Sequence, residues 1–111
     1  MMFEKIDFSP GVIKYDDFKI DAQVPLNEDD DALKEDMFQI EYPFEYVLDI
    51  GWYLGIKQFT VYVIKSFNWD EPIVKKRCKD ISELEVAMEE CNNLIKRLIK
   101  KENQIIDWEI V

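Results

Sequence analysis

The sequence predicts an α+β fold in which an antiparallel sheet of about five to six strands packs against one long C-terminal helix. Two patterns lead to this prediction. Apolar residues alternate with a period of two through most of 46–67, as in strands, and recur every three to four residues from about 81 to 103, as in a helix. The 111 residues suit a single domain, 1–111, and the 48% apolar content is enough for one core.

The N-terminal part of the chain predicts short strands joined by turn residues. Residues 2–8 and 12–15 flank a Pro-Gly turn, and we expect them to form a small hairpin. A further strand is expected over 18–24, where apolar and polar residues alternate until a proline ends the run.

The next segment, 26–41, leaves two alternatives open. Asn27 is an acceptable N-cap, and Leu33 and Met37 would share one side of a short second helix near 30–38. A loop over the same residues is the other alternative. The sequence does not decide between them.

The middle of the chain predicts a meander of three strands. We expect 46–54 and 58–67 to pair as a hairpin, with Gly55 at the reversal, where a positive φ is needed. Turn-forming residues over 68–72 precede a third strand over 73–78. The 58–67 strand is apolar on both faces, which indicates a central position in the sheet.

The helix predicted over 81–103 has an apolar stripe and a matching distribution of charge. Asp80 or Ser82 can cap its start, each with a glutamate three residues later, and Asn103 can end it. Acids gather early and bases late, which complements the helix dipole. A helix of this length extends about 35 Å, enough to cross several strands. The stripe consists of Leu84, Ala87, Met88, Cys91, Leu94, Ile95, Leu98 and Ile99.

After this helix, Ile106, Trp108 and Ile110 alternate with acidic residues. This pattern predicts a half-buried strand over 106–110 that pairs at a sheet edge. The sequence also leaves open a homodimer through an edge strand such as 105–111.

Composition excludes several classes of protein. The chain has no histidine, which removes Ser-His-Asp and Cys-His catalysis and His-ligated zinc. Cys78 and Cys91 lack C-x-x-C spacing, and we expect reduced thiols rather than a disulfide framework. The N-terminus lacks the features of a secretory signal, and no apolar run is long enough to span a bilayer. We therefore expect a cytoplasmic protein without membrane contact, a cofactor or an enzymatic activity.

The acidic charge is concentrated in one part of the chain. The whole protein has 24 acidic and 14 basic residues, a net charge of −10. Twelve acids and two lysines fall within 16–49, so this segment alone also carries −10. Residues 50–111 contain ten acids and ten bases and are balanced. Such a concentrated negative patch favours association with a basic partner protein.

The candidate partner-binding residues are therefore mainly acidic. Trp69 joins them because it lies in a turn beside Asp70 and Glu71, where we expect an exposed aromatic side chain. An alternative interpretation of the acids is a solvated loop that only aids solubility. The candidates are Asp16, Asp17, Glu28, Asp29, Asp30, Asp31, Glu35, Asp36 and Trp69.

Metal and nucleic-acid binding have less support. In an EF-hand loop starting at Asp29, position six would be Lys34 instead of glycine and position twelve Ile40 instead of glutamate. An improvised Mg²⁺ or Ca²⁺ site at the three consecutive aspartates is the remaining possibility for a metal, and we expect none. Direct nucleic-acid binding is disfavoured because a chain of this net charge repels phosphates.

In composition and layout the chain resembles the immunity proteins that bacteria pair with polymorphic or contact-dependent toxins. The features that carry the resemblance are the acid run over 27–31, the strand pair 46–67 and the helix 81–103 with its polarised charge. The resemblance implies a small α+β inhibitor that binds one cognate toxin, often a nuclease.

Two other functions stay open. A nucleic-acid mimic that inhibits a phage-defence enzyme would use carboxylates in place of phosphates, but it needs them spaced along a ridge, whereas this sequence has one clump. The chain could also be a non-catalytic subunit of an assembly.

Overall fold

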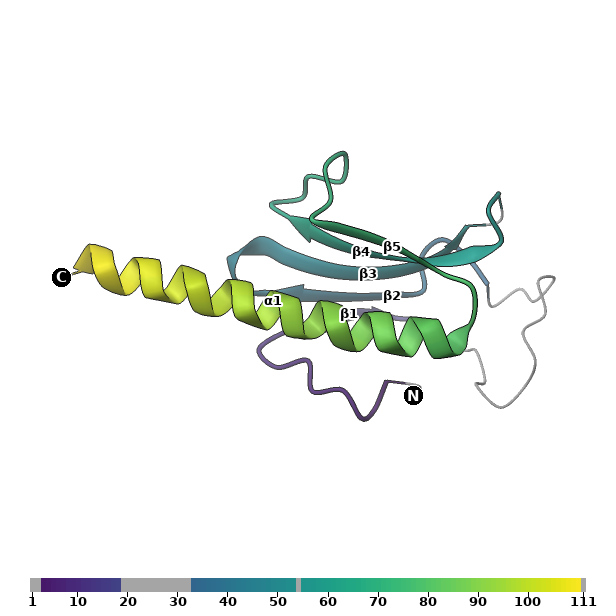
Figure 1. Ribbon diagram of the computed structural model, residues 1–111, viewed down its shortest axis with the longest axis horizontal. Coiled ribbons are helices and arrows are strands. Elements are labelled where there is room, and N and C mark those ends of the chain that lie inside the picture. The colour runs from purple at the N-terminus through teal and green to yellow at the C-terminus, as the bar shows by residue number, and fades with distance from the viewer. Residues whose placement is uncertain (1–2, 19–32, 54, 111) are drawn as a thin grey trace.

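The computed structural model describes residues 3–18, 33–53 and 55–110, with only the backbone described for 105–110. It contains a five-stranded antiparallel sheet, ordered β1-β2-β3-β4-β5, and one long helix that crosses one face of the sheet (Figure 1). This confirms the α+β fold expected from the sequence. No helix within these residues is both long and apolar enough to cross a bilayer. The elements are β1 (Val12–Asp16), β2 (Phe38–Tyr42), the 3-10 turn η1 (Pro43–Glu45), β3 (Tyr46–Tyr53), β4 (Gln58–Lys65), β5 (Val74–Cys78) and α1 (Ile81–Ile110).

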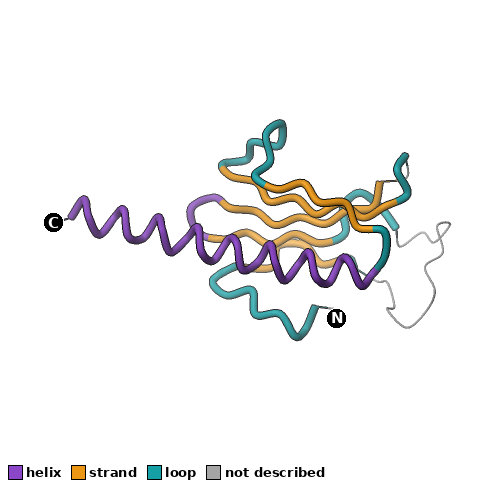
Figure 2. The backbone as a smooth tube through the Cα atoms, in the orientation of Figure 1, coloured by secondary structure: helices purple, strands orange, loops and turns teal. Residues whose placement is uncertain are grey.

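The three strands predicted in the middle of the chain are present as β3, β4 and β5, connected in sequence order (Figure 2). β3 and β4 pair along their whole length, from Tyr46 opposite Lys65 to Tyr53 opposite Gln58. The role predicted for Gly55 is wrong: its φ is not positive, and among the described residues of this turn the positive φ belongs to Lys57, at 52°. The amide of Lys57 donates to the carbonyl of Tyr53 at 2.9 Å, and this hydrogen bond helps to hold the turn.

The hairpin predicted at the N-terminus is wrong in its pairing. β1 lies where the strand over 12–15 was expected, but its partner is β2. The residues predicted as a strand over 2–8 form turns where they are described. The reason is that Phe3 and Phe8 pack into the core. Their rings lie 5.3 Å and 5.9 Å from that of Phe38.

The strand predicted over 18–24 falls outside the described residues, apart from its first residue. Phe18 is buried, with its ring 5.2 Å from that of Phe3 and 6.1 Å from that of Phe59. It therefore anchors the chain to the core just after β1.

The short second helix predicted near 30–38 is not present in the part of that range that is described, and the alternative of a loop is only partly right. Phe38 already belongs to β2, and the residues before it are hydrogen-bonded to β3. The amide of Met37 donates to Ile50 at 3.1 Å, and the amide of Trp52 donates to Lys34 at 2.8 Å. These backbone bonds to an existing strand outweigh the weak local preference for a helix.

The helix begins where the sequence predicts and ends later. Asp80 caps it: its carboxylate accepts from the amide of Glu83 at 2.9 Å, while the carboxylate of Glu83 accepts from the amide of Lys79. α1 continues past Asn103 to Ile110, so the strand predicted over 106–110 is wrong, and so is an edge strand there as a dimer contact. Asparagine inside a helix costs less than 1 kcal/mol, and each added turn residue gains a hydrogen bond.

The core lies between α1 and the facing side of the sheet. Ile40, Leu48 and Val61 of the strands and Leu84 and Ile95 of the helix are fully buried in one cluster. Cys78 and Cys91 are free thiols buried in the same cluster. Burial raises the pKa of each thiol to about 11, so both are protonated at neutral pH and neither is activated.

Polar contacts attach α1 to the rest of the chain. Asn92 is buried, accepts a hydrogen bond from the hydroxyl of Tyr42 at 2.8 Å and donates to the carbonyl of Asp7 at 2.9 Å. Further along, Lys65 at the end of β4 pairs with Glu102 at 3.0 Å and lies 4.3 Å from the centre of the Tyr46 ring. The helix is therefore fixed to both the N-terminal segment and the sheet.

Truncation of the core face of α1 should destabilise the protein. Leu84→Ala or Ile95→Ala leaves a cavity between helix and sheet and should lower the free energy of unfolding by about 2–5 kcal/mol, as measured by urea denaturation. Val86→Ala is the matched control, since Val86 lies on the same helix and is 54% exposed. Equal effects of the core and control substitutions would contradict the packing.

Candidate functional site

The face of the sheet opposite α1 carries a continuous row of polar and aromatic side chains. Side chains alternate along a strand, so the residues between the core positions point to this second face. One residue from each strand lies in register with the next, and no described helix or strand covers the row. In order from β1 to β5 the row is Tyr15, Gln39, Asp49, Tyr62 and Lys75.

An acidic pocket lies at the β1–β3 end of this row. It is an open cavity of about 260 Å³ lined by Tyr15, Asp36, Gln39 and Asp49. Two of the four lining residues are carboxylates, and the other two can donate hydrogen bonds. The pocket therefore has the size and polarity for a basic side chain.

Asp49 is the most unusual residue of the pocket. It is only 7% exposed, and its Oδ2 accepts a hydrogen bond from Gln39 Nε2 at 3.0 Å. Among the described residues no lysine or arginine forms an ion pair with it. Burial, and to a smaller extent the charge of Asp36, raise the pKa of Asp49 above its usual value. A buried carboxylate without a cation reduces stability, which points to a role other than holding the fold together.

Gly51 brings Asp36 beside Asp49. The chain before β2 bulges at Glu35 and Asp36, between the two backbone hydrogen bonds that attach Lys34 and Met37 to β3. The carbonyl of Glu35 lies directly over Gly51, and a Cβ on that glycine would overlap the carbonyl. The absence of a side chain at Gly51 therefore lets the acidic bulge rest on the sheet.

The structure places some of the predicted acidic residues around this pocket. Asp36 lines it, and Glu35 lines a neighbouring cavity. Asp17 forms an ion pair with Lys34 and accepts a hydrogen bond from the hydroxyl of Tyr15, a pocket residue, at 3.3 Å.

Asp16 contributes to a local turn, since its carboxylate accepts from the amide of Phe18 at 3.3 Å. The acid run 28–31 lies outside the described residues, and so does the improvised metal site considered there. Within the described residues, no three His, Cys, Asp or Glu side chains lie close enough together to hold a metal ion.

Aromatic and basic side chains occupy the β4–β5 end of the same face. The rings of Tyr53 and Tyr62 lie 6.2 Å apart, and those of Tyr62 and Trp69 lie 6.3 Å apart. Lys75 Nζ is 5.8 Å from the centre of the Tyr62 ring. Trp69 is 46% exposed, as the sequence predicts. A second open cavity, of about 320 Å³, is lined by Glu35, Tyr53, Gly55, Ile56, Thr60, Tyr62, Lys75 and Arg77.

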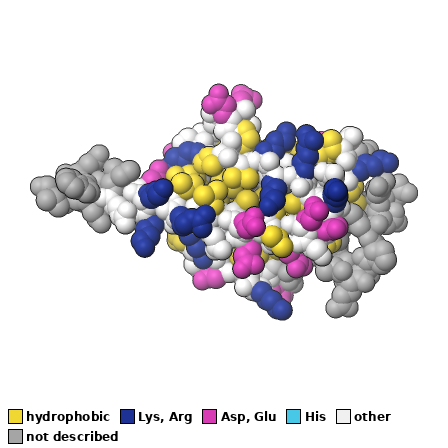
Figure 3. All heavy atoms as spheres, in the orientation of Figure 1, with side chains coloured by type: hydrophobic (Ala, Val, Ile, Leu, Met, Phe, Trp, Pro, Cys, Tyr) yellow, Lys and Arg dark blue, Asp and Glu magenta, His cyan; other side chains and the backbone are white. Residues whose placement is uncertain are grey.

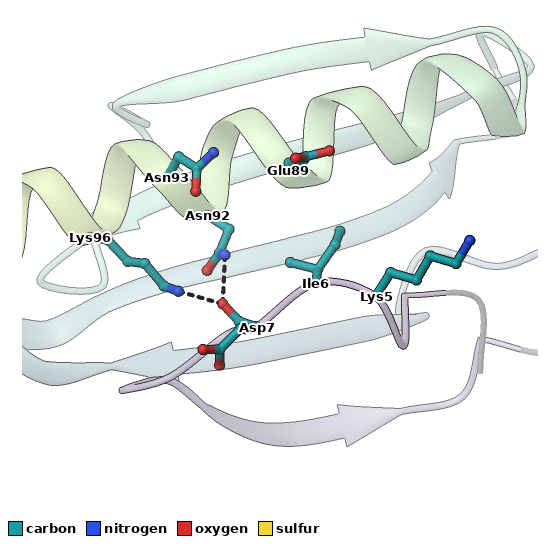
Figure 4. Close-up of a pocket in the computed structure, with 7 residues that line it drawn as sticks. All are labelled: Lys5, Ile6, Asp7, Glu89, Asn92, Asn93 and Lys96. Carbon is teal, nitrogen blue, oxygen red and sulfur yellow. Dashed lines mark hydrogen bonds between the residues drawn. The ribbon is translucent and has the colours of Figure 1, made fainter.

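A third cavity, on the helix side, has a structural role. It measures about 240 Å³ and lies between α1 and the N-terminal segment (Figure 4). Lys96 and Asn92 both donate to the carbonyl of Asp7, at 2.5 Å and 2.9 Å, so these polar groups hold the segment in place.

Basic and acidic side chains are interspersed on the side of the molecule seen in Figure 3, and the view shows no extended region of one sign.

Comparisons with protein-family models, with curated proteins and with solved structures find no match to this chain. Function is therefore inferred from the geometry of the described residues.

Sequence reasoning missed all five residues of the outward row. Tyr15, Gln39, Asp49, Tyr62 and Lys75 are not among the predicted site residues, because their alignment depends on the pairing of five strands. A signal for Asp49 was present: it is the single charged residue in the otherwise apolar stretch 46–53.

Replacement of Asp49 by asparagine should stabilise the protein at neutral pH. The raised pKa means that the folded state binds the proton of Asp49 more tightly than the unfolded state, so this group reduces stability once the pH exceeds its folded pKa. Asp49→Asn removes the charge and keeps the acceptor for Gln39. Urea denaturation should show a stabilised variant at pH 7 and no difference from the wild type near about pH 3, where the carboxyl is protonated in both states. Glu85→Gln, on the exposed side of α1, serves as control. A loss of stability at pH 7 would contradict this interpretation.

A side chain at Gly51 should displace the acidic bulge. Gly51→Ala places a methyl group against the Glu35 carbonyl and should cost about 1–3 kcal/mol in the free energy of unfolding. Gly55→Ala is the control, because a Cβ there would meet no atom within 4 Å. NMR shift changes should centre on Glu35, Asp36 and Asp49. An unaffected bulge in the Gly51 variant would show that the glycine is not needed.

Proposed function

We propose that this protein is a non-enzymatic inhibitor that binds a basic partner protein through the face of its sheet opposite α1. The observation that carries the proposal is the acidic pocket with Asp49, a buried carboxylate that has no cation among the described residues. A lysine or arginine from a partner would supply the missing charge. An arginine could also form paired hydrogen bonds with a carboxylate of the pocket.

The surroundings of the pocket support a protein as the partner. Asp36 places a second carboxylate in the pocket, and Glu35 adds negative charge in the neighbouring cavity. The exposed Trp69 and its neighbour Tyr62 are of the residue types that dominate binding energy in protein interfaces. Concentrated negative charge accelerates association with a cationic surface.

Within this class, the role that fits is that of an immunity protein for a bacterial toxin such as a nuclease. A toxin that acts on nucleic acid needs a cationic surface to hold phosphates, and an acidic face can cover that surface. The proposal rests on the resemblance in composition and layout together with the acidic pocket. It assigns no catalytic residue to this chain.

The partner can be identified by zero-length crosslinking. A carbodiimide joins carboxylates to amines, so treatment of native host cells that produce the tagged chain should link Asp36 or a neighbouring acid to a lysine of a basic protein. Mass spectrometry identifies the protein and both linked residues. Expression of that protein alone should arrest growth, and coexpression of this chain should restore it.

Charge variants test whether the pocket carries the binding. The double variant Asp36→Asn/Asp49→Asn should slow association with the crosslinked protein and lower its affinity about tenfold or more at low salt. Glu85→Gln/Glu89→Gln, with the same charge change on the exposed side of α1, should have little effect. The proposal would be contradicted if expression of the crosslinked protein alone did not arrest growth. Equally strong binding by both double variants would also contradict it.

A further inference from the structure

We infer that the partner surface is bipolar: it presents a basic group to the acidic pocket and a carboxylate to Lys75 and Arg77 at the other end of the same face. This inference rests on the proposed function and states which kind of partner surface the face accepts.

The two ends of the face have opposite charge. Asp49 and Tyr62 are cross-strand neighbours, and Tyr62 in turn lies opposite Lys75, so Asp49 and Lys75 belong to one row. Two strand spacings separate them, or about 10 Å. Arg77 lies beside Thr60 in the adjacent row and lines the same cavity as Lys75. A surface of uniform positive charge would therefore meet attraction at one end and repulsion at the other.

Lys75 and Arg77 differ in their ion pairing from Lys76, which lies between them in sequence. Lys76 points to the helix side and forms an ion pair with Glu90 of α1 at 2.9 Å. Lys75 and Arg77 form no ion pair with the described residues, although acids outnumber bases in the chain. Glu35 lines the same cavity but forms no ion pair with either base. The two cations thus remain available to a carboxylate from outside.

Tyr62 lies between the charged ends of the row, and its ring packs beside two further aromatic rings. Tyr53, Tyr62 and Trp69 meet edge to face, with interplanar angles of 79° and 73°. Tyrosine, tryptophan and arginine are the residue types enriched among interface hot spots. The rings stand edge to face instead of offering parallel flat surfaces, which suits apolar side chains of a protein better than stacked bases. The occupant is therefore a protein surface with a base, an apolar centre and an acid in that order.

This arrangement would set the orientation of the partner as well as its affinity. A base in the acidic pocket and an acid at Lys75 and Arg77 allow one direction of docking across the strands. The reversed orientation places like charges together at both ends, which is unfavourable. A bipolar face thus selects one partner among many basic proteins.

Charge reversal at the basic end distinguishes this inference from simple attraction between an acidic and a basic protein. Lys75→Glu/Arg77→Glu changes the net charge from −10 to −14, and so does the control Lys100→Glu/Lys101→Glu on the exposed side of α1. The probe is the protein crosslinked to Asp36 or its neighbours, purified and measured by surface plasmon resonance. We expect the first variant to bind about tenfold or more weakly, and the control to associate as fast as the wild type or faster.

Each outcome has a distinct meaning. If both variants bind more tightly, general electrostatics explains the binding and the bipolar surface is wrong, while the proposed function survives. If Asp36→Asn/Asp49→Asn has no effect, the proposed function itself fails. Sedimentation velocity of the chain alone completes the test: a dimer that Lys75→Glu/Arg77→Glu dissociates would show that a second copy occupies the face and would overturn the inference. Thermal melting confirms that each variant is folded.

Discussion

The packing of one helix against one side of a five-stranded sheet is the constraint on which the rest of the structure depends. The apolar stripe of α1 needs a complementary apolar surface, and the residues of β2, β3 and β4 that alternate toward it provide that surface. Because side chains alternate strictly along a strand, this packing also decides which residues point away from the helix. Asp49 and Tyr62 are on the outward face because Leu48 and Val61, their neighbours in sequence, are in the core.

The sequence was sufficient for the parts of the fold that depend on local patterns. The alternation in β3 and β4 and the stripe of α1 each repeat several times, so single exceptions do not obscure them. It was insufficient where distant contacts decide. Phe3 and Phe8 could have continued a strand, but their burial against Phe38 makes a turn more favourable. The same holds at the C-terminus, where the alternation of Ile106 and Trp108 fits a strand, but the continued helix needs no partner to satisfy its backbone.

The candidate site shows the same division between local and distant information. The surplus of acidic residues over 16–49 can be counted in the sequence, and Asp36 of that segment does line the pocket. Asp36 lies beside Asp49 because the chain bulges over Gly51. The only sign of this close backbone approach in the sequence is the glycine itself. Burial of Asp49 beside a like charge reduces stability. Proteins retain such costs mainly where binding or chemistry uses them.

The way in which both sheet edges are modified supports the proposal that a partner binds the face of the sheet and not an edge. An exposed edge strand can pair with a strand of another protein unless charge or irregularity prevents it. β5 carries the consecutive bases Lys75, Lys76 and Arg77, and the register of β1 shifts between Ile13 and Tyr15. Both features weaken strand addition. The alternate residues Lys75 and Arg77 then have two effects at once: they make the β5 edge unfavourable for pairing and give the adjacent face its positive end. Protection of the edge and polarity of the face thus follow from the same five-residue strand.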